Sequence, residues 1–147
     1  MEAPFPTHPP IALLLRLLYQ HHAQDIEAAL GEAGFGDLRP PHANVFPFVP
    51  PEGITVSELA ELARVRKQTM TQAVEQLERM GYVERRPNLR DRRSRLVFLT
   101  ERGASVKPIT HATAARVEEH WAELTSPEEL EAMRASLMRL LAELRSQ

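Results

Sequence analysis

The stretch Gly81–Gly103, GYVERRPNLRDRRSRLVFLTERG, has the pattern of a β-hairpin with a basic loop. Residues 82–84 (Tyr-Val-Glu) begin an extended segment, and residues 94–99 alternate in polarity and contain Leu-Val-Phe, which predicts a return strand. Residues 87–93 between them are polar and begin with proline, as turns do. The segment therefore predicts two antiparallel strands joined by an exposed, positively charged turn.

Charge is distributed unevenly along the 147 residues, whose formal net charge is −2. The window from Gly53 to Gly103 holds 11 basic and 7 acidic residues, a net charge of +4, and the remainder carries −6. Seven of the basic residues lie between Arg85 and Arg102, and all are arginine, the side chain that pairs bidentately with phosphate and fits narrow grooves. Because a solvated charged face is the alternative interpretation, the local structure has to decide.

Two short helices are predicted just before the hairpin. Thr55-Val-Ser-Glu58 has the form of a capping box and opens a helix that ends before a turn at residues 64–66. The next helix runs from about Lys67 to Met80, with Gly81 placed to end it. Two helices joined by a tight turn and followed by a basic hairpin predict a winged helix-turn-helix over residues 53–103 in a mainly α fold.

The flanking segments are helical. Residues 11–30 repeat apolar side chains on more than one face, which is typical of a helix that is buried or shared with a partner. The proline-rich residues 40–51 have room for one short helix. A helical stretch is expected from Thr100 to about residue 120, with a kink at Pro108 near its start. A final helix begins with Ser126 as N-cap, Pro127 at its first position and Glu129 as the capping-box partner.

The segment 53–103 closely resembles the MarR family of bacterial winged helix-turn-helix transcriptional regulators. In that family the hairpin carries D-x-R followed by five residues and L-T, and Asp91, Arg93, Leu99 and Thr100 stand at those spacings. The resemblance implies a homodimer that binds a pseudo-palindromic double-stranded DNA operator, with Arg93 in the minor groove and Asp91 orienting the wing arginines. The expected DNA-binding residues are Arg66, Lys67, Gln68, Thr69, Thr71, Gln72, Arg90, Arg92, Arg93 and Arg95.

One position departs from the family pattern, because Arg66 stands where the family often has Ser or Thr as N-cap of the recognition helix. Losing a side-chain cap costs about 1 kcal/mol of helix stability, unless Arg66 contacts phosphate instead.

The remaining helices are expected to form a dimerisation region from residues 11–52 and 104–147, preceded by a proline-rich arm over residues 1–10. Their apolar stripes exceed what one small module can cover. The expected dimer-face residues are Leu14, Leu18, Leu137, Leu140, Leu141 and Leu144, and packing within one chain is the alternative.

The resemblance also implies a small effector, often aromatic, bound between the dimer region and the winged helix, and a repressor released by it. The candidate lining residues are Tyr19, His22, His42, Phe46, Phe48 and Trp121, each of which could instead be ordinary packing. No cofactor is expected.

The sequence disfavours several classes of protein and of functional site. The chain has no cysteine, which excludes disulfides, thiolate metal sites and thiol redox sensing. No Ser/His/Asp order, Gly-rich phosphate loop or H-E-x-x-H motif indicates an enzyme. The longest uncharged apolar run, Ile11–Leu15, is too short to span a bilayer, so a cytoplasmic protein is expected. The alternatives are a protein-interaction winged helix without specific DNA binding, a metal-responsive regulator built on the six histidines, and a protein that sequesters an aromatic compound.

Overall fold

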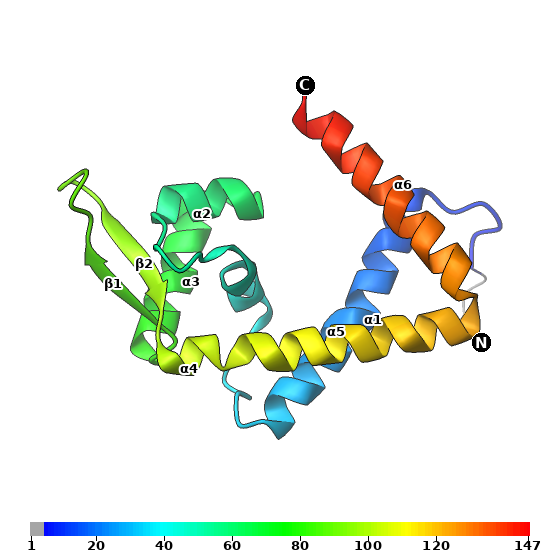
Figure 1. Ribbon diagram of the computed structural model, residues 1–147, viewed down its shortest axis with the longest axis horizontal. Helices are drawn as coiled ribbons and strands as arrows, with labels where there is room; N and C mark the ends of the chain where they lie inside the picture. Colours follow the sequence, from blue (N-terminus) through cyan, green and yellow to red (C-terminus); the bar gives the residue numbers. More distant parts are fainter. Residues whose placement is uncertain (1–4) are drawn as a thin grey trace.

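The computed structural model describes residues 5–147, and Figure 1 shows two bodies joined by one long helix. Helix α5 (Val106–Leu124) extends from the winged-helix end of the molecule to the opposite end. Helix α1 (Ile11–Glu32) crosses α5, and helix α6 (Pro127–Arg145) turns away from the end of α5. Within the proline-rich arm, residues 1–4 lie outside the described residues, and residues 5–10 form neither helix nor strand.

Helices α2 (Val56–Ala63) and α3 (Lys67–Arg79) form the helix-turn-helix. The predicted capping box is confirmed, because Thr55 Oγ1 accepts a hydrogen bond from the Glu58 backbone at 3.2 Å and the Glu58 carboxylate accepts one from the Thr55 backbone at 3.0 Å. The chain reverses through Arg64, which has a left-handed φ of 56°. Helix α3 starts after Arg66 without a side-chain cap, as the sequence pattern predicts.

The hairpin pairs β1 (Val83–Pro87) with β2 (Arg95–Leu99) in antiparallel register, Val83 facing Leu99 and Pro87 facing Arg95. A further bridge joins Ile54 to Val97, with backbone hydrogen bonds of 3.1 and 2.7 Å in the two directions. This bridge attaches the wing to the segment that precedes α2, so the hairpin is fixed to the helix-turn-helix on both sides. The predicted strands and turn are confirmed.

The core lies in and beside the winged-helix body. Leu59, Met70, Leu77 and Val97 are buried there, and Tyr82 is fully buried, with Phe46 packed edge-on against it at 5.9 Å. No residue of α6 is buried among the residues the structure describes. Helices α1 and α5 reach this core through Leu30 and Val106, whereas none of the described residues of α6 belongs to it.

Residues 40–51 hold two 3-10 helices, η1 (Pro40–Asn44) and η2 (Phe46–Phe48), where one short helix was predicted. Pro47 has no N–H to continue a helix from η1, and 3-10 turns suit such short pieces.

The stretch predicted to be one helix from Thr100 divides into α4 (Glu101–Ala104) and α5. Pro108 has no N–H for the carbonyl of Ala104, which interrupts the helical hydrogen bonds at this junction.

Of the capping box predicted at the start of α6, one of the two hydrogen bonds is present. Ser126 Oγ accepts from the Glu129 backbone at 3.1 Å, but within residues 5–147 the exposed Glu129 side chain returns no bond to Ser126. In the same part of the chain, no helix has the length and apolar composition needed to cross a membrane.

Candidate nucleic-acid interface

Helix α3 has a buried apolar side and an exposed polar side. Met70, Val74 and Leu77 are buried against α2 and the hairpin. The exposed residues at its beginning are Arg66, Lys67, Gln68, Thr69 and Gln72. None of these five side chains makes a hydrogen bond to another described residue, whereas Thr71 is half-buried and its hydroxyl donates to the Lys67 carbonyl at 2.9 Å. Amide and ammonium groups presented in this way suit base edges in a major groove.

The first turn of α3 also carries positive electrostatic potential. Its leading N–H groups have no side-chain cap, and the positive end of the helix dipole lies there. Arg66 and Lys67 are exposed at the same place. The beginning of α3 therefore attracts anions, as a helix end facing a phosphate backbone must.

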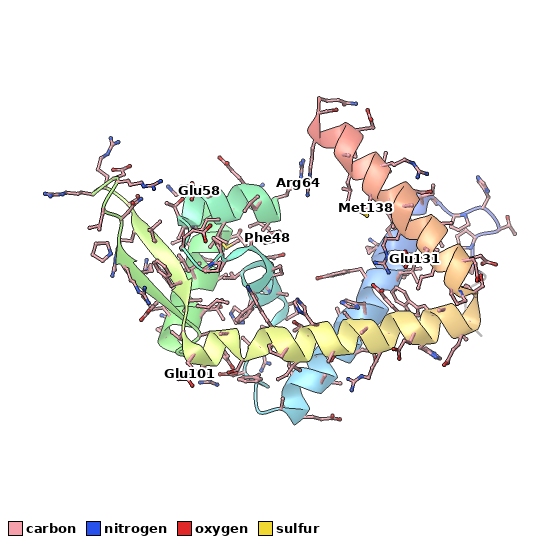
Figure 2. The ribbon with its side chains drawn as sticks, viewed as in Figure 1. Phe48, Glu58, Arg64, Glu101, Glu131 and Met138 are labelled. Carbon is pink, nitrogen blue, oxygen red and sulfur yellow. The ribbon has the colours of Figure 1, made fainter. Side chains whose placement is uncertain are left out.

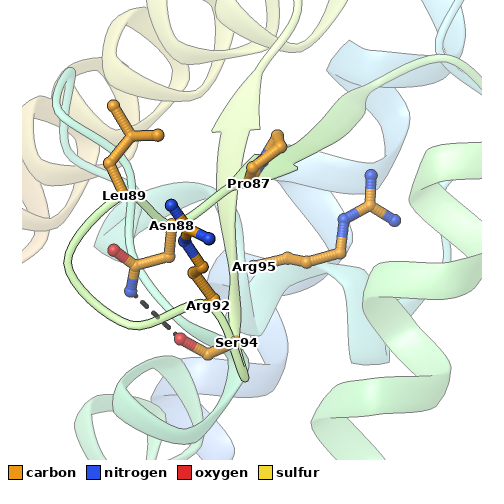
Figure 3. A pocket seen from close by; sticks show the side chains of 6 residues that line it. All are labelled: Pro87, Asn88, Leu89, Arg92, Ser94 and Arg95. Atoms are coloured by element: carbon orange, nitrogen blue, oxygen red, sulfur yellow. Dashed lines mark hydrogen bonds between the residues drawn. The ribbon is translucent and has the colours of Figure 1, made fainter.

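The wing turn is held by two short polar side chains (Figure 3). Asn88 Oδ1 accepts from the Arg90 backbone at 3.1 Å, and Asn88 Nδ2 donates to Ser94 Oγ at 3.0 Å. Asp91 Oδ1 accepts from the Arg93 backbone at 3.0 Å and from Arg93 Nε at 3.2 Å. The turn is thus a structured loop, and Asp91 contacts Arg93, the arginine that it is predicted to orient.

The wing arginines differ in their exposure and hydrogen bonding. Arg90 and Arg92 are exposed, and the side chain of Arg93 is 92% exposed. Arg95 is also exposed, but its Nη2 donates to the Arg85 carbonyl at 2.8 Å, which holds it along the neighbouring strand. A hollow of about 400 Å³ lies beside the turn (Figure 3) and is lined by Pro87, Asn88, Leu89, Arg92, Ser94 and Arg95.

Two arginines of the hairpin have partners that the charge pattern did not reveal. Arg85 forms a two-point ion pair with Glu78 of α3, at 2.8 and 3.2 Å, and this hydrogen bonding holds the pKa of Glu78 below its ordinary value. Arg86 bonds Glu84 and stacks 4.1 Å from the Phe98 ring centroid. Both therefore contribute less free charge than the count of seven arginines suggested.

The six candidate ligand-contacting residues are not brought together around one hollow within the described chain. His42 and Phe46 are buried in the core, and Phe48 packs against it half-buried. Tyr19 is 61% exposed and His22 is half-buried on α1. Trp121 lines a hollow of about 320 Å³ between α1 and α5, with Asp25, Ala28, Ala29, Glu32, Thr113, Arg116, Val117 and His120.

The candidate dimer residues lie on helix faces that the chain itself leaves uncovered. Leu140, Leu141 and Leu144 are 55%, 53% and 57% exposed, Leu14 and Leu18 are also exposed, and Leu137 is half-buried. Figure 2 shows the α6 side chains, Met138 among them, projecting from a helix whose C-terminal half extends away from α5. As for metals, no three His, Asp or Glu side chains cluster as ligands anywhere in residues 5–147.

Comparisons with known proteins agree with this geometry. A family model described as MarR family matches residues 47–94. A curated relative, the transcriptional activatory protein BadR of Rhodopseudomonas palustris, is 43% identical over 54 residues, which are 37% of this chain and 31% of that protein.

Solved structures share the fold over nearly the whole chain. A crystal structure of MarR superposes with a TM-score of 0.82 at 24% identity, covering 98% of this chain and 97% of its own. FabT of Streptococcus pneumoniae, in complex with DNA, gives a TM-score of 0.74 at 24% identity, covering 92% and 96%. The resemblance to the MarR family is thereby confirmed, with a family match that spans the helix-turn-helix and the wing turn.

Proposed function

We propose that this chain is a MarR-family, homodimeric, sequence-specific DNA-binding transcriptional regulator whose DNA affinity is modulated by a small aromatic ligand. The observation that carries the proposal is the exposed polar beginning of α3, where Lys67, Gln68 and Gln72 make no bond to another described residue while the opposite side of the helix is buried. FabT, which shares this fold, has been solved in complex with DNA.

In this proposal, side chains of α3 read base edges in the major groove. Lys67 donates to guanine or phosphate, and the amides of Gln68 and Gln72 bond base edges; Thr69 and Thr71 lie on the same turns. Arg93 enters the adjacent minor groove, held at its base by Asp91. The remaining phosphate contacts come from Arg66, Arg90, Arg92 and Arg95.

The dimer is proposed from the uncovered leucines of α1 and α6. Residues 11–52 and 104–147 would form the dimerisation region, residues 53–103 the DNA-binding region, and residues 1–10 an arm. A two-fold dimer places two recognition helices about 34 Å apart, one turn of the duplex. Isologous packing of the exposed leucines would then cover apolar area that otherwise faces water.

An effector acts through its different affinities for two dimer arrangements. The α1–α5 hollow beside Trp121 offers aromatic and polar lining for such a molecule. The expected effect on transcription is repression, whereas BadR is named as an activatory protein. A reporter placed downstream of a selected binding duplex measures the sign directly, since expression falls on adding a repressor and rises on adding an activator.

DNA binding is tested with a duplex recovered by the protein from a random-sequence library. Because neutralised phosphates release counterions, log K should fall linearly with log salt, with a slope of roughly −0.9 for each phosphate contacted. Retention of no duplex would favour the protein-interaction alternative. Tight binding of an aromatic compound without DNA binding would favour sequestration.

A further inference from the structure

Residues 37–42, which lead from α1 into η1, contact the residues that follow recognition helix α3 at one point and α3 itself at a second point. At the first point, Tyr82 Oη donates to Asp37 Oδ1 at 2.5 Å. Arg102 Nη2 donates to the other Asp37 oxygen at 3.2 Å and to Tyr82 Oη at 3.0 Å, and its guanidinium lies 4.3 Å from the Tyr82 ring centroid. Arg102 Nη1 also donates to the carbonyl of Met80, the C-cap of α3, at 2.9 Å.

The second contact is made by His42, which is buried with 4% of its surface exposed. Its Nδ1 lies 2.9 Å from the backbone N–H of Arg39, which donates to it. That bond places the imidazole proton on Nε2, which donates to Gln76 Oε1 on α3 at 2.8 Å. Both ring nitrogens are therefore used, and the imidazole has one orientation.

These contacts supply the connection between α1 and α3. Helix α3 packs mainly on α2, β1 and η1, while α1 packs mainly on α5. The segment 37–42 leads from α1 into η1, which packs on α3, so it connects α1 to α3 independently of the route through α5, α4 and the hairpin. Hydrogen bonds are directional, and in each contact one partner is a buried side chain, Tyr82 or His42, whereas the others are exposed. Such bonds favour one arrangement, whereas apolar surfaces can slide.

We infer that Asp37, His42, Gln76, Tyr82 and Arg102, here called the α1–α3 clasp, are positioning residues that set the angle of the recognition helix relative to the dimerisation helices. The clasp holds the end of α3, and the proposed base-reading side chains stand at its beginning. A helix of 13 residues is roughly 20 Å long, so a tilt of about 5° at the clasp moves the reading end by about 2 Å. This inference rests on the proposed DNA-binding function and adds to it the residues that orient α3.

The first test compares Tyr82→Phe, which removes one hydroxyl and keeps the ring, with Asp37→Asn and with the double variant. The probes are a duplex selected by the wild type and a scrambled duplex of the same composition. We expect each variant to lose about tenfold in affinity for the selected duplex only, with an unchanged salt slope, and the double variant to lose no more than the larger single loss. Gln20→Ala, exposed on α1, is the control and should match the wild type.

A purely structural contribution would lower thermal stability yet leave the ratio of the two affinities unchanged below the unfolding transition, and that result would overturn the inference. Failure of the wild type to prefer any duplex would instead defeat the proposed function.

A second test needs no DNA. Because the chain has no cysteine, spin labels can be placed at Gln24→Cys on α1 and Glu75→Cys on α3, both exposed, with labelled chain diluted into unlabelled chain. Tyr82→Phe and Asp37→Asn should shift or broaden the α1–α3 distance distribution, and Gln20→Ala should not. Identical distributions in all four proteins would show that the clasp does not position α3.

Discussion

A single carboxylate oxygen of Asp91 accepts two hydrogen bonds from Arg93, one from the backbone N–H at 3.0 Å and one from Nε at 3.2 Å. The first bond shapes the wing turn, and the second fixes the near end of the guanidinium. The far end remains in solvent, since the side chain is 92% exposed. Asp91 thus reduces the conformational freedom of Arg93 without covering the atoms that would meet DNA.

Replacing Arg93 with alanine should weaken binding to a selected duplex by about 1–3 kcal/mol. The free energy of unfolding should change by less than about 0.5 kcal/mol, because the side chain touches little besides Asp91. Fluorescence anisotropy and urea unfolding measure the two effects. Arg79→Ala removes the same charge from the other end of α3 and serves as control. Equal losses for both variants would mean that Arg93 has no special place in the interface.

Two substitutions of Asp91 separate its two bonds. Asp91→Asn keeps an oxygen for the Arg93 backbone and loses the charge that attracts the guanidinium, whereas Asp91→Ala loses both bonds. Removing a negative charge also raises affinity for any DNA. We therefore expect both variants to bind scrambled duplex more tightly and to discriminate less well, with the larger loss of discrimination in the alanine variant. Unaltered discrimination in both would remove the orienting function from Asp91.

The uncovered leucines of α6 predict a change in oligomeric state. Leu140→Glu should weaken the dimer at least tenfold, since burying one leucine is worth about 1.5–3 kcal/mol. Leu62→Glu on α2 is a matched control, because Leu62 and Leu140 are 54% and 55% exposed. Sedimentation equilibrium distinguishes them. A Leu140→Glu protein that dimerises as well as Leu62→Glu would place the interface elsewhere.

Two glycines predict opposite effects on stability. A Cβ at Gly103 would lie 2.0 Å from the carbonyl oxygen of Tyr82, whereas one at Gly31 would have no heavy atom within 4 Å. Gly103→Ala should therefore destabilise the fold by about 1–3 kcal/mol or more through overpacking. Gly31→Ala, within helix α1, should stabilise it by about 0.5–1 kcal/mol. Urea unfolding measures the free energy of unfolding of both variants. A Gly103→Ala protein as stable as the wild type would mean that α4 can move away from Tyr82.

The parts of this molecule that could be predicted from sequence are those determined by neighbouring residues. Three such features are present in the structure, and each depends on a few adjacent positions. They are the Thr55–Glu58 capping box, the hairpin, and the start of α3 at Arg66 without a side-chain cap. At Pro108 the sequence predicts a kink, and the structure instead divides the stretch into α4 and α5 at Ser105. Periodicity alone does not weigh one missing N–H against the helix on either side.

Contacts between distant residues could not be predicted. Nothing in the local pattern pairs Asp37 with Tyr82 or His42 with Gln76, which are 45 and 34 residues apart. For the same reason His42 and Phe46 were grouped as ligand-lining candidates, although the fold buries both. Composition identifies polar and aromatic side chains, but their surroundings depend on how remote helices meet.

The buried phenol of Tyr82 predicts the alkaline limit of stability. Burial, together with the hydrogen bond to Asp37, raises the pKa of Tyr82 to about 12. The fold thus favours the neutral phenol, which has a pKa near 10 in unfolded chains. This stabilisation is complete below about pH 10 and is lost as the pH rises through about 12.

Tyr19→Phe leaves Tyr82 as the only tyrosine of two, so the ultraviolet absorbance of its phenolate can be titrated directly. We expect a midpoint near 12 in the folded protein and near 10 in urea. Asp37→Asn in this background should lower the folded midpoint, because the carboxylate opposes ionisation of the phenol. Tyr82→Phe should flatten the fall in unfolding free energy above pH 10. Coincident folded and urea titrations would mean that the phenol is not held by Asp37 in solution.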